Sequence, residues 1–485
     1  MGKNYYIVAI ELSSSKISGA VGIETTEGIR ILAATSAPVD GFISKGIVRN
    51  IDKTGEAINS VVNILDSQLN DVEIKKAYIS FAGLSVHSIM SKVSKSFGEY
   101  TRITKDIIED MERENDETFQ APDGYIRMQV DTQEYKFDGN VDYNPIGAST
   151  QSIECNYLNI VMKEQLYKQL CDSFAQADIE IIDCMSAARL DADIMLPDEL
   201  KRNGCALVNI GADTTTVSIY KNGKPKKVTV LPLGSNNITR DITNEHVSPA
   251  NAEEVKIIRG YNSPSNNNEY IESKTLNSII NARMGEILQN VNYQLEESGE
   301  RIHHIVFTGG GSKLKNIGLL IEEFLPGFKT EIKPEPQLNI ISESGINVDG
   351  VITTALYGLL KQGKENCCED IQPVIQQNGN FFTQTEMEGL STDKSQEELE
   401  RERVTDREEE KRRKEEERSR KEEEKRKREE EKKIKREQKQ KNRGGWKISS
   451  IFQEWFEDLT RDPDEENPEE KNKNKEQQEK NSNNE

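Results

Sequence analysis

A strand–turn–strand unit occurs twice in this chain, and this repeat limits the possible folds more than any other feature of the sequence. In the first unit, apolar runs at 6–12 and 16–23 flank a turn of three serines. In the second unit, apolar runs at 206–210 and 217–220 flank a turn of small and hydroxyl residues. The units lie about 200 residues apart in a chain of 485 residues, so the sequence predicts a duplicated fold with two similar halves.

The segments around these units alternate between helical and strand-like patterns. Apolar residues at helical spacing predict a helix over 53–69, and a strand-like run follows at 77–82. A further strand is predicted at 305–308, followed by a third turn of small residues at 309–312 and a helix at 314–324. This alternation predicts a body of the α/β class.

Residues 84–163 interrupt the alternation, and we interpret them as an inserted unit. We expect a helix near 105–114 and strands near 125–130 and 157–162 within it. The patterns of the main body resume after residue 163.

The composition separates this body from a polar C-terminal region. Only 34% of the residues are hydrophobic, which is low for a folded chain, and the deficit is concentrated after residue 391. The net charge of −21 argues against nucleic acid as a partner. No apolar run is long enough for a transmembrane helix. The six cysteines lack Cys-x-x-Cys spacing, which favours buried, reduced thiols over a zinc site or a disulfide framework.

A polar linker leads into a highly charged segment. From residue 408, triplets of Glu recur every seven residues, with Lys or Arg four positions later. This order favours a helix through i,i+4 ion pairs, but the a and d positions are charged, so no coiled-coil seam exists. We therefore expect 397–443 to form a single solvated helix that acts as a spacer, with disorder as the alternative.

Residues 446–459 have the apolar spacing of an amphipathic helix. Its aromatic residues suit the headgroup zone of a membrane, whereas its acidic opposite face disfavours anionic lipid. We expect it to bind a membrane, and docking into a groove of the body or of a partner is the alternative. The residues expected to contact lipid are Trp446, Ile448, Ile451, Phe452, Trp455, Phe456 and Leu459. The acidic residues 462–485 are expected to be disordered.

Three turns of small or hydroxyl residues each follow a predicted strand, at 13–15, 211–215 and 309–312. Backbone N–H groups and hydroxyls in such turns can converge on a phosphate group. No Walker A loop and no Rossmann glycine motif occurs in the chain. One turn of this kind would fit an ordinary hairpin, but three of them favour a nucleotide site.

The turn motifs resemble those of the superfamily of actin, hexokinase and the DnaK-type chaperones. Residues 11–16 and 209–214 resemble its two phosphate hairpins, and 308–312 resemble its adenosine motif. Within that superfamily, the chain is most similar to the FtsA family of bacterial cell-division proteins. The features that carry this resemblance are Glu11 followed by Lys16, the segment 231–242, a Gln-Glu-Tyr motif at 133–135 in the inserted unit 84–163, and a terminal amphipathic helix. It covers about residues 5–362 and the helix at 446–459.

The resemblance implies a two-lobed actin-like α/β fold with an FtsA-type insertion. Lobe 1 (1A) would comprise 1–83, 164–200 and 351–377, and subdomain 1C would comprise 84–163. Lobe 2 (2A) would comprise 201–235 and 305–350, and subdomain 2B would comprise 236–304. The linker and charged spacer at 378–443, the membrane-targeting helix at 444–461 and an acidic tail at 462–485 would follow.

The resemblance also implies an ATP site between the lobes. The expected ATP-binding residues are Ser13, Ser14, Ser15, Lys16, Gly211, Ala212, Asp213, Thr214, Thr215, Gly234, Ser235, Glu253, Lys256, Gly309, Gly310, Gly311 and Ser312. Glu11 and Asn209 are expected to hold Mg²⁺ through water. Asn209, Ala212 and Asp213 depart from the usual Asp and glycines of the superfamily, so slow or absent ATP hydrolysis is expected. A carboxylate at Asp213 would repel a triphosphate unless magnesium lies between them.

The implied function is that of an adaptor at the cytoplasmic face of the cell membrane, at the division site. It would bind ATP, self-associate as an actin-like polymer and tether filaments of the tubulin-like protein FtsZ to membrane lipid, alongside other division proteins. Arg283 and Glu286, on a helix at 274–297, would face a partner, or would be solvated helix charges. The alternatives are an actin-like pilus-assembly adaptor and a small-molecule kinase of the same superfamily.

Overall fold

The computed structural model describes residues 5–69, 72–262, 270–335, 337–342 and 345–370. The chain divides into two units, 1–375 and 376–485, and every described residue belongs to the first. The predicted linker, spacer, membrane helix and acidic tail therefore lie outside the described residues.

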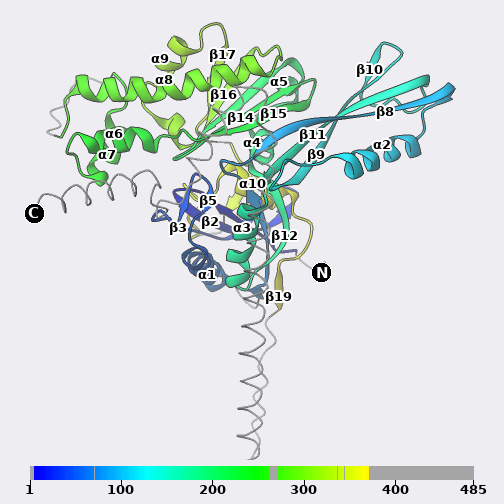
Figure 1. Ribbon diagram of the computed structural model, residues 1–485. Helices are drawn as coiled ribbons and strands as arrows, with labels where there is room; N and C mark the ends of the chain where they lie inside the picture. The colour runs from blue at the N-terminus through cyan, green and yellow to red at the C-terminus, as the bar shows by residue number, and fades with distance from the viewer. Residues whose placement is uncertain (1–4, 70–71, 263–269, 336, 343–344, 371–485) are drawn as a thin grey trace, which may run out of the picture. The chain divides into compact units, whose positions relative to one another are not determined.

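A six-stranded sheet forms the first half of the body, with the order β12-β7-β1-β2-β3-β18 (Figure 1). Its strands are β1 (Ile7–Leu12), β2 (Lys16–Thr25), β3 (Gly28–Pro38), β7 (Lys76–Phe81), β12 (Glu180–Ser186) and β18 (Ile340–Ser342). β1 pairs antiparallel with β2 and parallel with β7. Apolar side chains such as those of Ile10, Ile17 and Ile79 are fully buried, so both faces of this sheet are covered.

Four helices accompany the first sheet, and a fifth, α5 (Asp198–Asn203), packs on β13 (Cys205–Ile210) and β14 (Thr215–Lys221) of the second sheet. The four are α1 (Ile51–Gln68), α3 (Glu164–Gln176), α4 (Ala187–Met195) and α10 (Thr354–Gln362). The side chain of Asn50 accepts a hydrogen bond from the Lys53 amide at 2.9 Å and so caps α1, and Val61 and Leu65 are buried where α1 packs on β2 and β3. α10 packs on β1 and β2. The helix predicted at 53–69 is confirmed.

Two short strand pairs lie outside the main sheets. β4 (Ile43–Ser44) and β5 (Ile47–Val48) form a tight hairpin just before α1. β6 (Val72–Ile74) pairs with β19 (Cys368–Asp370) near the end of the described residues.

A nine-stranded sheet forms the second half, with the order β10-β9-β11-β8-β15-β14-β13-β16-β17. Its strands are β8 (His87–Arg102), β9 (Tyr125–Phe137), β10 (Asn140–Asp142), β11 (Ser149–Lys163), β13 (Cys205–Ile210), β14 (Thr215–Lys221), β15 (Lys224–Leu231), β16 (His304–Thr308) and β17 (Lys329–Ile332). The order β17-β16-β13-β14-β15 has the same parallel and antiparallel pairings as β12-β7-β1-β2-β3. The duplicated hairpins predicted from the sequence are confirmed.

The segment 84–163 extends this second sheet. Its strands β8, β9 and β11 lie side by side and α2 (Lys105–Thr118) packs along β8, with Val93, Met111 and Tyr157 in a small core between them (Figure 1). Sequence analysis missed β8, because its apolar residues do not alternate regularly with polar ones. The segment joins the rest of the sheet through one strand pair, Thr229 with His87.

The remaining helices cover the second sheet. They are α6 (Asn236–Asn244), α7 (Pro249–Arg259), α8 (Ser273–Glu297), the 3₁₀ turn η1 (Gly310–Lys313) and α9 (Ile317–Phe324). Their apolar faces share a core with β13 and β14, in which Val208, Ile280 and Leu320 are fully buried. The predicted helix at 314–324 starts later, at Ile317, because Asn316 has a left-handed backbone. None of the described helices is long and apolar enough to cross a membrane.

Candidate functional site

One cavity of about 810 Å³ collects the three turns predicted from the sequence. It is lined by the turn between β1 and β2, the turn between β13 and β14, and the turn after β16, together with the first residues of α4 and α10. Two duplicated hairpins therefore contribute to the same site from the two halves of the body.

The first turn presents hydroxyls and one cation to the cavity. The Ser13 hydroxyl donates to the Lys16 carbonyl at 2.8 Å and accepts from the Lys16 amide at 3.2 Å, which fixes a tight turn. Ser14, at the tip, accepts a hydrogen bond from the Gly46 amide at 2.9 Å. The Lys16 ammonium donates to the Gly350 carbonyl, and burial together with Lys313 lowers the pKa of Lys16 against the opposing effect of Glu11. All four predicted residues, Ser13 to Lys16, line the cavity.

The second turn brings only part of its predicted set into the cavity. Gly211, Ala212, Asp213 and Thr214 line it, and the Gly211 amide donates to the Thr214 carbonyl at 2.8 Å. The side chain of Thr215 is buried and donates to the Leu233 carbonyl at 2.7 Å. Neither Thr215 nor Gly234 lines the cavity, so both support the turn from behind.

The third turn closes against the second hairpin. Gly309 has a φ of 86°, and a Cβ there would lie 2.2 Å from Asn209 Oδ1, so only glycine fits. Gly309, Gly310 and Gly311 line the cavity, whereas Ser312 is buried and donates to the Gly309 carbonyl at 2.7 Å. Of the other predicted ATP-binding residues, Ser235, Glu253 and Lys256 also line the cavity.

Glu253 and Lys256 form an ion pair of 2.7 Å on α7. Thr239 of α6 joins them, donating to Glu253 at 2.5 Å and accepting from Lys256 at 2.9 Å. This network fixes both side chains at the cavity wall. Ile257, next in sequence, also lines the cavity and is 59% exposed, which offers an apolar surface for a flat ring.

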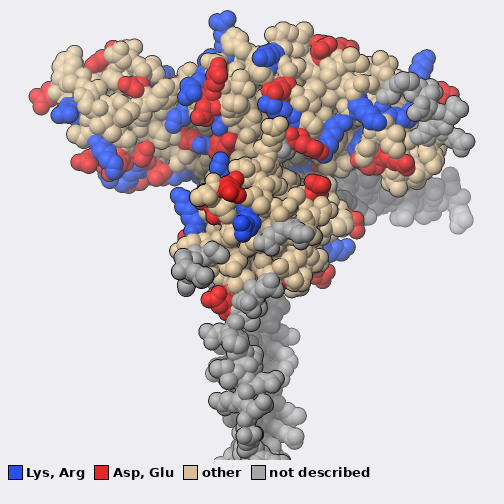
Figure 2. All heavy atoms as spheres, turned by 180° about the vertical axis from the view of Figure 1, so that it is seen from behind, with Lys and Arg blue, Asp and Glu red and all other residues tan. Residues whose placement is uncertain are grey.

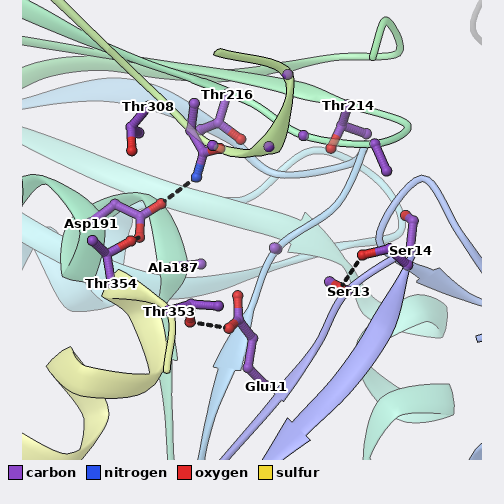
Figure 3. A pocket seen from close by; sticks show the side chains of 18 of the residues that line it. Glu11, Ser13, Ser14, Ala187, Asp191, Thr214, Thr216, Thr308, Thr353 and Thr354 are labelled. Atoms are coloured by element: carbon purple, nitrogen blue, oxygen red, sulfur yellow. Dashed lines mark hydrogen bonds between the residues drawn. The ribbon is translucent and has the colours of Figure 1, made fainter. Parts of the chain in front are cut away.

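Two acidic side chains face each other across the base of the cavity. Figure 3 shows Glu11 and Asp191 pointing inward, with Thr353 and Thr354 beside them. Thr353 donates to Glu11, and Thr354 donates to Asp191. Burial raises the pKa of Glu11 to about 7, with Asp191 adding to the effect and the Thr353 hydrogen bond and Lys16 opposing it. Burial also raises the pKa of Asp191.

Sequence analysis did not identify Asp191. The Asn209 side-chain amide donates to its second oxygen at 2.7 Å, so both oxygens of this buried carboxylate are hydrogen-bonded. The available signal was the run of small residues at 186–188, which follows β12 and allows the start of α4 to approach the cavity.

The cavity offers a suitable but sparse environment for Mg²⁺. Glu11 and Asn209, the predicted ligands, both line it, and Asp191 supplies a second carboxylate. Among the described residues no cluster of three or more His, Cys, Asp or Glu side chains could hold a metal ion. Because Mg²⁺ usually keeps several waters and one or two carboxylates, these residues fit a water-mediated ion bound together with phosphate.

The predicted partner residues lie away from this cavity, on α8. Arg283 contacts Asp241 of α6 at 2.5 Å and Glu286 at 2.9 Å. These hydrogen bonds hold the pKa of Arg283 above its usual value. Acidic and basic side chains are interspersed over the face of the molecule seen in Figure 2, so this kind of pairing is common on the surface.

Known proteins match the chain in sequence and in fold. The family model "Cell division protein FtsA" matches residues 206–344, which include the second and third turns. Cell division protein FtsA of Porphyromonas gingivalis is 27% identical over 345 residues, covering 66% of this chain and 71% of that protein. FtsA of Escherichia coli strain K12 is 22% identical over 388 residues, covering 74% of this chain and 90% of that protein.

A solved structure supports the fold. The structure described as "PilM-PilN type IV pilus biogenesis complex" has a TM-score of 0.54 at 15% identity and covers 74% of this chain and 99% of that one. At this identity the likeness concerns the fold alone. The chain is therefore related to the cell division protein FtsA, and its body has the actin-like α/β fold that the sequence predicted.

Proposed function

We propose that this chain is a cell-division adaptor that binds ATP, self-associates as an actin-like protein and tethers FtsZ filaments to the membrane. The observation that carries the nucleotide part is the convergence of three turns and Lys16 on one cavity. Hydroxyls, backbone amides and a cation gathered at one end of a cavity are the groups that recognise phosphate.

The site residues divide by chemistry between the phosphates and the nucleoside. Ser14, Lys16 and Thr214 would face the phosphates, where in Figure 3 Ser14 and Thr214 lie on the same side of the cavity. Glu253 and Gly310 would face the nucleoside. Glu11, with Asn209, would hold Mg²⁺ through water, and the ion would offset phosphate charge when bound.

The hydrogen bonds and burial of the Asp191 carboxyl group are consistent with slow or absent ATP hydrolysis. A general base needs a free carboxylate oxygen within reach of the attacking water. Thr354 and Asn209 each occupy one of the two acceptor sites on an Asp191 oxygen, and burial raises the pKa of Asp191, which favours the protonated form that cannot accept a proton from water. The arrangement therefore supports binding more than rapid turnover.

A fluorescent ATP analogue tests the nucleotide site. Lys16→Ala should weaken binding about 10- to 100-fold, because it removes a charged donor worth roughly 1.5–3 kcal/mol. Lys361→Ala removes an exposed lysine of α10 and serves as the matched control. Equal binding by both variants and the parent protein would remove the three-turn site from the proposal.

Membrane tethering and FtsZ binding need a separate experiment. Both tryptophans of the chain, Trp446 and Trp455, belong to the predicted terminal helix, outside the described residues. A blue shift of their emission on adding vesicles, together with FtsZ that floats with vesicles only when this protein is present, would support the tether. Emission that is already blue without lipid and does not change would exclude it.

A further inference from the structure

The hairpin of β4 and β5 turns through Lys45 and Gly46, next to the cavity. Both residues have positive φ, 53° and 68°, which is the geometry of a two-residue type I′ turn. Gly46 is required there, because a Cβ would lie 2.6 Å from the Gly83 Cα. The turn therefore has a strained backbone. Its two consecutive amides are available for hydrogen bonds outside the hairpin.

Each of these two amides contacts a different phosphate turn. The Gly46 amide donates to the Ser14 hydroxyl at 2.9 Å, in the first turn. The Lys45 amide donates to Asp213 Oδ2 at 3.1 Å, in the second turn. One short hairpin thus forms hydrogen bonds with both turns, although the turns belong to different halves of the body.

Asp213 is bonded through both carboxylate oxygens. Besides the Lys45 amide, the Ser44 hydroxyl donates to Oδ2 at 3.3 Å, and the Asn236 side-chain amide donates to Oδ1 at 2.8 Å. The carboxylate is therefore held toward the β4–β5 hairpin, across the boundary between the two halves. Charge-assisted hydrogen bonds of this kind are about twice as strong as neutral ones.

Charge gives a second reason for a carboxylate at this position. Burial lowers the pKa of Lys45, and Arg49 and Arg240 lower it further, while Asp213 opposes them. None of these three cations forms an ion pair with a carboxylate in the described part of the chain. Asp213 therefore offsets part of the positive charge around the hairpin.

The same turn also contacts the base of the segment 84–163. The Lys45 carbonyl accepts a hydrogen bond from the Leu84 amide at 3.2 Å, and β8 begins three residues later. A Cβ at Gly83 would lie 2.5 Å from the Gly46 carbonyl oxygen, so the two backbones are in close contact. A movement of the turn would therefore reach this segment directly.

We propose that the Lys45–Gly46 turn is a relay between the phosphate end of the cavity and the base of segment 84–163, and that Asp213 is the positioning residue that engages it. The proposal rests on the proposed ATP binding. Phosphate held between the two turns would fix Ser14 and the second turn, and hence both contacts of the relay. ATP should thus tighten the hairpin and the Leu84 contact together.

Amide hydrogen exchange of the full chain, with and without ATP, tests the relay. In the parent protein, ATP should slow exchange in peptides covering 43–50 and 84–93. Asp213→Ala should abolish that slowing and weaken binding of a fluorescent ATP analogue about tenfold.

Two further variants grade the effect. Asp213→Asn keeps the shape of the side chain but loses its charge, so its slowing of exchange and its binding of the analogue should lie between those of the parent protein and Asp213→Ala. Ser44→Ala removes one of the three hydrogen bonds and should give a smaller change in the same direction.

A charge-matched variant serves as the control, and the measured exchange and ATP binding distinguish failure of the relay from failure of the proposed function. Glu245→Gln makes the same change in net charge at the exposed residue that follows α6 and should behave as the parent protein. Tighter ATP binding by Asp213→Ala would overturn the relay, since it would show that the carboxylate merely repels phosphate. Unchanged exchange at Lys45 in Asp213→Ala without ATP would overturn it as well. Absence of ATP binding in the parent protein would instead overturn the proposed function.

Discussion

The two halves of the body share a five-strand arrangement but use it differently. Glu11 is the fifth residue of β1, and Asn209 is the fifth residue of β13, so the two occupy equivalent positions. The first half follows this position with a turn of serines and Lys16, whereas the second has a turn that carries Asp213. Duplication has therefore kept the backbone while the polar groups that face the cavity have diverged.

The edges of the two sheets have diverged as well. Within the described residues, the first sheet adds only the three-residue strand β18 beyond β3. Beyond β15, the second sheet continues into β8, β11, β9 and β10. The two halves therefore differ in their turns and at one sheet edge, where substitutions should have different effects.

The largest effect is expected at Gly309, where the second half depends on close backbone contact. Gly309→Ala combines a positive φ with a Cβ 2.2 Å from Asn209 Oδ1. We expect the free energy of unfolding to fall by more than about 2 kcal/mol, measured by chemical denaturation. Gly310→Ala is the matched control, because nothing lies within 4 Å of its added Cβ. Equal losses in the two variants would show that the contact with Asn209 does not matter.

The second prediction makes the two hairpins alike. Asn209→Asp places a carboxylate like that of Glu11 in β13, but here it would meet the buried Asp191 at the site of a 2.7 Å hydrogen bond. Two like charges in a buried site should lower the free energy of unfolding by about 2 kcal/mol at pH 7.5.

The pH dependence of this variant identifies the cause. Repulsion raises the shared pKa of the two acids in the folded state, so the folded protein takes up a proton as pH falls. The deficit of Asn209→Asp should therefore shrink between pH 7.5 and pH 5, and Mg²⁺ should reduce it at the higher pH. A deficit that is the same at both pH values would mean that packing, and not charge, is responsible.

Local patterns allowed most of the fold to be predicted. The hairpins, α1 and the turn after β16 were found because their apolar periodicity and small-residue turns are local signals. Strand β8 was missed, because its residues are exposed or only partly buried, apart from Val93, and need no regular apolar pattern. The continuation of the second sheet through Thr229 and His87 is a tertiary pairing that no local pattern reports.

The residues of the candidate site that lie in or beside the turns were predicted from the sequence, whereas a residue placed by helix packing was missed. Ser14, Lys16 and Thr214 lie in the turns that the sequence identified. Asp191 lies in a helix whose position is set by packing against α10, which the residue pattern of α4 does not reveal. Asp213 was predicted to bind ATP with magnesium between its carboxylate and the phosphates, but its bonds to Ser44, Lys45 and Asn236 are long-range contacts that no local pattern reports.

The third prediction concerns the edge where the second sheet continues. His87 lies at this junction, packs against the Tyr125 ring at 5.3 Å and contacts the Ser85 carbonyl through Nδ1 at 3.1 Å. Burial lowers the pKa of His87. The unfolded chain therefore takes up a proton more readily, and stability should fall as pH drops below about 6.5.

The variant His87→Gln isolates this group, since the other histidines titrate equally in both proteins. The difference in unfolding free energy between the parent protein and the variant should decrease below pH 6.5, by at most about 1.4 kcal/mol per pH unit. Parallel curves from pH 8 to pH 5 would show that the junction does not sense protonation.

The smallest effect on stability is expected on α8, which belongs to the second half alone. Arg283 is 37% exposed and its carboxylate partners Asp241 and Glu286 are 24% and 40% exposed, so solvent screens the pairs. Arg283→Ala should change the free energy of unfolding by less than about 1 kcal/mol.

The same variant tests whether α8 contacts FtsZ. FtsZ binding measured by co-sedimentation should weaken about tenfold if this face contacts the partner, because a desolvated charge contributes more than a solvated one. Arg113→Ala, at an exposed ion pair on α2, is the matched control. FtsZ binding by Arg283→Ala that equals binding by the parent protein would assign Arg283 to helix stabilisation alone.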